Sequence, residues 1–156
     1  MNGQTTFHIH LRGRVQGVGF RPFVCRLAAS FGLTGSVRNG ADGVHVVFNA
    51  RPEEAQAFFQ QTVSDAPTQS IVTGADLWET NPQHFSNFSI APSDQAPASG
   101  LLLTPDFALC NACKMELLAP LNRRYRYAFI TCTQCGPRYS ILTGLPYDRE
   151  QTAMVD

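Results

Sequence analysis

The sequence predicts an α+β protein in which a ferredoxin-like βαββαβ sandwich is followed by a small cysteine-rich module. Two observations predict this arrangement. Residues 1–91 switch between the period of two that is typical of strands and the period near 3.6 that is typical of helices. Four of the five cysteines, in contrast, fall in the last third of the 156 residues.

The sandwich is expected to open with a strand and a helix. Apolar and polar side chains alternate over residues 7–15, as in a strand with one buried face, and we expect His8 and His10 on its outer face. Between residues 20 and 31 apolar side chains recur at offsets of three and four, which predicts a helix with one buried stripe. Gly32 is a suitable stop for this helix.

A hairpin follows, with strands at residues 33–39 and 44–48 and a turn at residues 40–43. The two glycines of that turn can adopt the positive φ that a tight hairpin needs.

The sandwich is then completed by one more helix and by closing strands at residues 71–78 and 88–90. Residues 52–63 predict the helix, because acidic side chains occupy its first turn and apolar side chains recur on one face. The side chains expected to face inward are Ala55, Phe58, Phe59 and Val63.

Composition and charge exclude several classes of protein. Hydrophobic residues make up 44% and charged residues 15% of the chain, which is ordinary for a folded globular protein. Twelve basic residues balance twelve acidic ones, so no overall field attracts nucleic acid or anionic lipid. Neither a membrane span nor the apolar segment of a signal peptide is visible. We therefore expect a cytoplasmic protein without a membrane partner.

The domain boundaries are predicted from a change in composition. Residues 92–100, PSDQAPASG, are rich in proline and small residues and have little to bury. We expect the sandwich to occupy residues 1–91, a linker residues 92–105 and the cysteine module residues 106–156.

The turn after the first strand, residues 13–22, is a candidate anion site. It carries three glycines where a strand meets a helix N-terminus, so successive N–H groups can face one concavity. Arg21 could hold a phosphoryl group with its planar fork. By spacing alone, a plain tight turn with Arg21 in solvent fits equally well, and neither a P-loop nor a GxGxxG turn matches.

The strings GRVQGVGFRPF and VRNGADGVHV resemble the two signature elements of the acylphosphatase family, and the resemblance extends over residues 7–91. It implies an acylphosphatase-like fold and hydrolysis of acyl phosphates such as carbamoyl phosphate. It also implies that Arg21 binds phosphate and that Asn39 places the attacking water, although Asn39 alone would pass for a turn residue. The phosphoryl oxygens would be held by the backbone N–H groups of Gln16, Gly17, Val18, Gly19, Phe20 and Arg21.

The four clustered cysteines form the pattern C-x2-C-x18-C-x2-C, which is typical of a four-thiolate zinc site. Such a site leaves no open coordination position, so we expect a structural zinc. Two pairs argue against a thioredoxin-like redox motif, and a cytoplasmic location argues against disulfides. The expected ligands are Cys110, Cys113, Cys132 and Cys135.

The segment between the cysteine pairs is basic and aromatic, and it has two interpretations. It could bind RNA or a protein through Arg123, Arg124 and Arg126, with the sandwich as an inert scaffold. Alternatively, its aromatic residues form the core around the metal, and its arginines balance the thiolates. We favour the second interpretation, so a nucleic-acid partner is not expected.

The strings PDFALCNAC, RRYRYAFITCTQCGPRYSIL and LPYDR resemble the first zinc-finger segment of the HypF family, the carbamoyltransferases of [NiFe]-hydrogenase maturation. Ala128 and Thr131 stand where that family usually has proline and asparagine. The resemblance implies an N-terminal piece that hydrolyses carbamoyl phosphate to carbamate and phosphate. In the full-length family, later domains pass the carbamoyl group to a HypE-type acceptor protein, toward the cyanide ligands of the hydrogenase.

Overall fold

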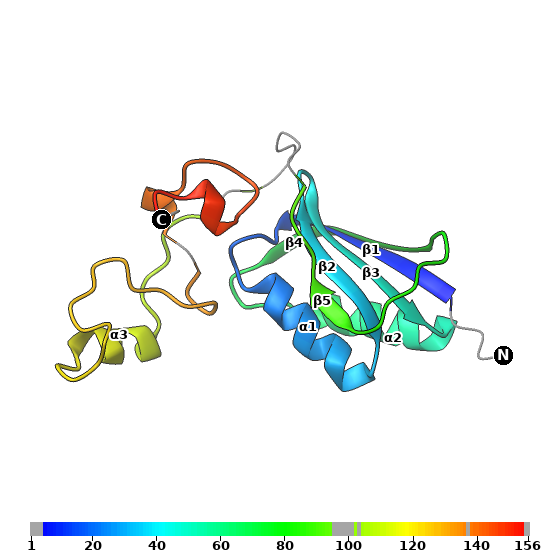
Figure 1. Ribbon diagram of the computed structural model, residues 1–156, viewed down its shortest axis with the longest axis horizontal. Helices are drawn as coiled ribbons and strands as arrows, with labels where there is room; N and C mark the ends of the chain where they lie inside the picture. Colours follow the sequence, from blue (N-terminus) through cyan, green and yellow to red (C-terminus); the bar gives the residue numbers. More distant parts are fainter. Residues whose placement is uncertain (1–4, 95–101, 103, 137, 155–156) are drawn as a thin grey trace.

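The computed structural model describes residues 5–94, 102, 104–136 and 138–154. A sheet with two helices forms one part of the molecule, and a smaller part that contains α3 lies beside it (Figure 1). The predicted linker, residues 92–105, falls largely outside the described residues, so the proposed domain boundaries stay a prediction. Within the described residues, none of the helices has the length and apolar character that crossing a bilayer requires.

The predicted order of strands and helices is confirmed, and the predicted element bounds agree with the observed ones to within about two residues. The elements are β1 (Thr5–Arg14), α1 (Phe20–Phe31), β2 (Thr34–Gly40), β3 (Gly43–Ala50), α2 (Pro52–Ser64), β4 (Ile71–Glu79), β5 (Phe88–Ile90) and α3 (Asn111–Leu118), with short 3-10 turns at Tyr139–Ile141 and Arg149–Gln151.

The sheet has the strand order β4-β1-β3-β2-β5. The β1–β3, β1–β4 and β2–β3 pairs are antiparallel, whereas β5 lies parallel to β2. Because β1 pairs with β3 on one side, His10 stands directly opposite His45. The sheet therefore brings side chains from distant parts of the sequence onto one face.

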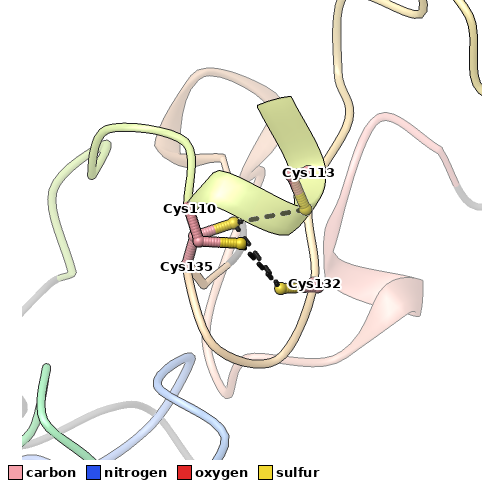
Figure 2. A group of neighbouring side chains, drawn as sticks. All are labelled: Cys110, Cys113, Cys132 and Cys135. Carbon is pink, nitrogen blue, oxygen red and sulfur yellow. Dashed lines mark hydrogen bonds between the residues drawn. The ribbon is translucent and has the colours of Figure 1, made fainter. Parts of the chain in front are cut away.

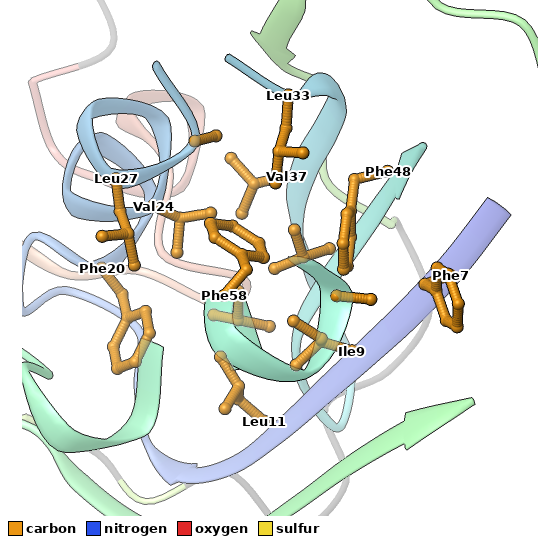
Figure 3. Packing of buried hydrophobic residues seen from close by; sticks show 14 of the residues in the cluster. Phe7, Ile9, Leu11, Phe20, Val24, Leu27, Leu33, Val37, Phe48 and Phe58 are labelled. Carbon is orange, nitrogen blue, oxygen red and sulfur yellow. The ribbon is translucent and has the colours of Figure 1, made fainter. Parts of the chain in front are cut away.

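The main core lies between the other face of the sheet and the two helices (Figure 3). Phe58 of α2 is fully buried and meets Phe48 of β3 edge to face, with ring centroids 4.8 Å apart. Phe31 of α1 packs against the Phe58 ring, with the two ring centroids 5.6 Å apart. Burying aromatic side chains of this size stabilises a small domain strongly, so this core holds the sheet and the helices in a fixed relation.

The predicted inward face of α2 is wrong at one position. Val63 is 36% exposed, and Thr62 is fully buried in its place. Thr62 follows Ala55 and Phe58 by seven and four residues, so it lies on their stripe. Its hydroxyl donates to the carbonyl of Phe58 at 2.8 Å, which satisfies the buried oxygen.

Candidate active site and finger

The glycine turn between β1 and α1 has the backbone conformation that an anion site needs. Gly17 and Gly19 adopt positive φ values of 70° and 78°. Gly19 is the N-cap of α1 and provides no side-chain cap, so the first amides of the helix are left for another partner. Val18 and Phe20 are buried in the core on either side of Gly19 and anchor the turn.

Gln16 connects this turn to the β2–β3 hairpin. Its side-chain NH2 group donates to the carbonyls of Gly40 and Gly43 at 2.7 and 2.9 Å. Its side-chain carbonyl oxygen accepts a hydrogen bond from the backbone amide of Tyr147 at 3.3 Å. The buried Gln16 side chain therefore fixes the turn against the end of β2, the strand that carries Asn39.

Asn39 is 1% exposed, yet neither its side-chain nitrogen nor its side-chain oxygen has a hydrogen-bond partner among the described residues. An unpaired buried amide costs about 1–3 kcal/mol. Asn39 lines a cavity of about 540 Å³ that Arg21 also lines. The fold thus keeps the Asn39 amide, whose burial is unfavourable, at a cavity where a ligand could form hydrogen bonds with it.

The predicted site residues are brought together, with one partial exception. The same cavity is lined by Gln16, Gly17, Gly19, Phe20, Arg21 and Asn39. Val18 does not line it, because its side chain is 2% exposed and belongs to the core. The role predicted for Val18 uses its backbone amide alone, and it stays a prediction.

Arg21 is half-buried and engaged, so the alternative of an arginine in solvent does not hold. Its guanidinium forms an ion pair with Asp148 at 2.8 Å and donates to the carbonyl of Tyr147 at 3.0 Å. Sequence reasoning assigned no role to these two residues, although both belong to the string LPYDR. Tyr147 is 7% exposed, its hydroxyl has no partner among the described residues, and burial raises its pKa.

The segment around the second cysteine pair lies directly against the glycine turn. A Cβ added to Gly19 would stand 2.6 Å from the carbonyl oxygen of Thr133, and one added to Gly136 would stand 2.8 Å from that of Gly17. The hydroxyl of Thr104 donates to the carbonyl of Gln16 at 2.8 Å. Glycine at these positions permits backbone contact that closes one side of the cavity.

The four predicted metal ligands cluster (Figure 2). The Sγ atoms of Cys110 and Cys132 lie 3.6 Å apart, and Cys135 Sγ lies 3.8 Å from both Cys132 Sγ and Cys113 Sγ. Sulfurs bound to zinc at about 2.3 Å in a tetrahedron are about 3.8 Å apart. The thiol positions thus fit a zinc ion, as the cysteine spacing suggests.

The electrostatics of the cluster also call for a cation. Burial and the neighbouring thiols raise the pKa of Cys113 to about 12. Burial also opposes ionisation of Cys135, but hydrogen bonds from backbone amides at Cys110 and Cys132 lower its pKa to about 6. Four thiols this close cannot all become thiolates without a metal ion to balance them.

The favoured interpretation of the basic, aromatic segment is wrong for its aromatic residues. Tyr125, Tyr127 and Phe129 are each more than 40% exposed, and the small core consists of Ile130 with Cys113 and Cys135. Cysteine sulfurs and the aliphatic side chains of Leu109, Leu117 and Ile130 fill this core without the large rings. These rings therefore lie on its surface.

Two arginines hold together the cysteine module, which is called the finger from here on. Arg124 forms an ion pair with Glu116 at 2.6 Å and donates to the carbonyl of Thr131. Arg138 donates to the carbonyls of Phe107 and Ile130 and lies 3.7 Å from Cys135 Sγ. Binding of RNA or a protein through the segment stays an untested hypothesis, although Arg124 is already engaged.

Comparison with known families decides what the sandwich is. Residues 7–90, more than half of the chain, match the acylphosphatase family. The chain belongs to the acylphosphatase family. An acylphosphatase from Thermotoga petrophila is 38% identical over 82 residues, which are 53% of this chain and 91% of that protein.

The part that follows the acylphosphatase domain matches a second family, the HypF finger, over residues 109–142. Both domains together resemble the carbamoyltransferase HypF of Synechocystis, which is 43% identical over 149 residues. A structure of full-length HypF in its phosphate- and nucleotide-bound form superposes with a TM-score of 0.85 over 97% of this chain, at 35% identity. The predicted resemblance to HypF is thus confirmed. The chain spans about a fifth of the length of these relatives, 19% and 20%.

Proposed function

We propose that the acylphosphatase domain hydrolyses acyl phosphates, with carbamoyl phosphate as the principal substrate, to a carboxylate and phosphate. The observation that carries this proposal is the buried amide of Asn39, which lacks a hydrogen-bond partner among the described residues and lines the same cavity as Arg21 and the glycine turn. Carbamoyl phosphate is preferred because both domains resemble HypF carbamoyltransferases. The product would then be carbamate.

Each group would have a distinct task. Backbone amides from Gln16 to Arg21 and the Arg21 guanidinium would bind the phosphoryl oxygens and stabilise the charge of the transition state. The Asn39 amide would accept a hydrogen bond from water and hold it in line with the anhydride oxygen. As water oxygen bonds to phosphorus, the bond from phosphorus to the anhydride oxygen breaks and carbamate leaves. One water proton stays on the phosphate and the other is released to solvent. Carbamate is a good leaving group, so no strong base is required.

The four cysteines would hold a structural zinc ion, which gives the finger most of its folding free energy. Support comes from the sulfur distances and from the small size of the core around Ile130. Unpaired thiols of this kind fit a cytoplasmic location.

For the whole protein we propose the HypF role in hydrogenase maturation. The acylphosphatase domain would supply carbamate to a carbamoyl-transfer reaction on a HypE-type acceptor protein, for the cyanide ligands of [NiFe] hydrogenases. The support is the shared order of acylphosphatase domain and finger in HypF relatives.

Release of phosphate from carbamoyl phosphate by the purified, zinc-loaded chain tests the proposal. Arg21→Ala and Asn39→Ala should each lower the rate about a hundredfold to a thousandfold, because each removes a group aligned with the transition state. Arg26→Ala and Asn87→Ala change an arginine and an asparagine that are both exposed and should leave the rate unchanged. Activity that survives Arg21→Ala would overturn the catalytic assignment.

A panel of acyl phosphates tests the substrate separately. Carbamoyl phosphate should give a higher kcat/KM than acetyl phosphate or benzoyl phosphate. Equal values for all three would remove carbamoyl phosphate as the specific substrate and leave a general acylphosphatase.

A further inference from the structure

A second group of metal-ligating side chains lies on the outer face of the sheet, and none of its members lines the cavity described above. It consists of His10 on β1, His45 on β3 and Asp42 in the turn between β2 and β3. The Nε2 atoms of His10 and His45 lie 3.3 and 2.8 Å from the two carboxylate oxygens of Asp42. One ligand atom from each residue lies within 4.8 Å of the other two.

Strand pairing produces this convergence. His10 and His45 are cross-strand partners, and their rings stack at 4.4 Å with an interplanar angle of 10°. Their side chains are only 12% and 11% exposed, whereas that of Asp42 is 47% exposed. The ligand atoms are thus held by rigid strands and remain accessible from the side of the turn.

Glycines keep space free around the ligand atoms. A Cβ on Gly40 would stand 2.7 Å from His45 Nε2 and 3.2 Å from the Asp42 carboxylate. A Cβ on Gly43 would stand 3.2 Å from His10 Nε2. Any side chain at these two positions would intrude on the point where the three residues meet.

The Nδ1 atoms of His45 and His10, on the far side of each ring, have different partners. His45 Nδ1 lies 3.0 Å from His8 Nε2, a contact of the kind that orients metal-bound imidazoles from their far side. His10 Nδ1 is 3.5 Å from Arg12, whose guanidinium is paired with Asp76 at 2.7 Å. His45 can therefore present Nε2 to an ion directly. His10 Nδ1 accepts from Arg12 only over a long contact of 3.5 Å, and it must take up the ring proton when His10 Nε2 binds an ion.

We propose that His10, His45 and Asp42 bind a divalent transition-metal ion of the class of Ni²⁺ or Zn²⁺ through two imidazole nitrogens and one carboxylate oxygen. Imidazole suits these ions, whereas Mg²⁺ and Ca²⁺ prefer oxygen ligands alone. Ligand atoms bound at about 2.0–2.1 Å in a tetrahedron lie about 3.3 Å apart. The observed separations of 3.3 and 2.8 Å are to the two different oxygens of Asp42, so binding through one oxygen requires the carboxylate to rotate and His45 to move slightly outward.

Titration of the zinc-loaded, untagged chain with Ni²⁺ tests this site. Isothermal calorimetry should find one equivalent of Ni²⁺ bound, while a zinc-sensitive dye detects no release from the finger. Asp42→Asn and His45→Gln should weaken Ni²⁺ binding about tenfold or more. His84→Gln, which changes an exposed histidine outside the cluster, should bind Ni²⁺ like the unaltered chain.

Paramagnetic Ni²⁺ provides a second readout, which locates the bound ion. It should broaden the ring NMR signals of His10 and His45 before those of His84. If no Ni²⁺ binds, the three side chains form a hydrogen-bonded network only and the proposal fails. It fails equally if Asp42→Asn and His84→Gln behave alike. Because the Asp42 side chain is 47% exposed, that variant is informative even if His45→Gln does not fold.

Discussion

Arg21, in the first turn of α1, forms an ion pair at 2.8 Å with Asp148, which follows the finger in the sequence. The two side chains are 23% and 28% exposed, so their attraction is only partly screened by water. A carboxylate thus faces the guanidinium that we propose for phosphoryl binding. An incoming phosphate must compete with Asp148 for Arg21 or share it.

Asp148→Asn should therefore strengthen binding of inorganic phosphate. The change keeps the size of the side chain and removes the competing charge. A partly exposed ion pair is worth about 0.2–1 kcal/mol, so we expect the inhibition constant of phosphate to fall up to about fivefold. Glu150→Gln removes an exposed acid two residues away and should leave the constant unchanged. A constant that rises in Asp148→Asn would show that Asp148 positions Arg21 for phosphate instead of competing with it.

Asn39→Ala should separate activity from stability. The amide has no partner among the described residues, so its removal breaks no hydrogen bond of the folded chain. We expect the free energy of unfolding to fall by less than about 1 kcal/mol, while phosphate release is lost as described above. Phe58→Ala, in the core, should lower the unfolding free energy by about 3–5 kcal/mol. A comparable loss for Asn39→Ala, measured by urea denaturation, would make Asn39 a structural residue.

The sandwich could be predicted because its elements are encoded locally. The alternation at residues 7–15 and the stripe of α1 follow directly from strand and helix periods. The prediction for α2 failed at Val63 because Thr62, a polar residue, satisfies its hydroxyl within the helix and competes for the inward position.

The candidate site was predictable only in part. The glycine turn and the CxxC pairs are short motifs whose residues are neighbours in sequence. The contact between Arg21 and Asp148 and the meeting of His10 with His45 depend on long-range packing and strand register, which no local pattern reveals. For the same reason the positions of His10 and His45 in the sequence do not indicate a shared site.

Removal of the metal should unfold the finger and spare the sandwich. The finger core is small, with Ile130, Leu109 and Leu117 packed around the cysteines, whereas the sandwich has a separate core around Phe48 and Phe58. After treatment with a zinc chelator, hydrogen exchange should become fast in α3 and remain slow in β1 and β3. Loss of protection in both parts would mean that the two cores fold as one unit. Inductively coupled plasma analysis should find one zinc ion per chain before chelation if the four thiols form one site.

His8 should make stability depend on pH. Burial, with His45, Arg38 and His10 nearby, lowers the pKa of His8 from 6.5 to about 4, and Asp42 acts in the opposite direction. Between these values the unfolded chain binds a proton that the folded chain does not, so stability falls as the pH falls from about 6.5 toward 4. His8→Gln should show a shallower loss of melting temperature over this range. Parallel curves for both proteins would exclude this contribution.

The single tryptophan reports on the same titration. The Trp78 ring lies 4.3 Å from the His8 ring, so protonation of His8 should change its fluorescence. We expect a midpoint near the lowered pKa of about 4, and its absence in His8→Gln. A midpoint close to 6.5 would indicate that His8 is more hydrated than its packing implies.

The most direct test of the phosphoryl-binding account is a crystal structure of the zinc-loaded chain with inorganic phosphate at saturating concentration. The account predicts phosphate in the glycine turn, with amides of the turn and the Arg21 guanidinium on its oxygens and Asn39 facing it. Phosphate absent from the turn, with Arg21 still paired only to Asp148, would contradict it.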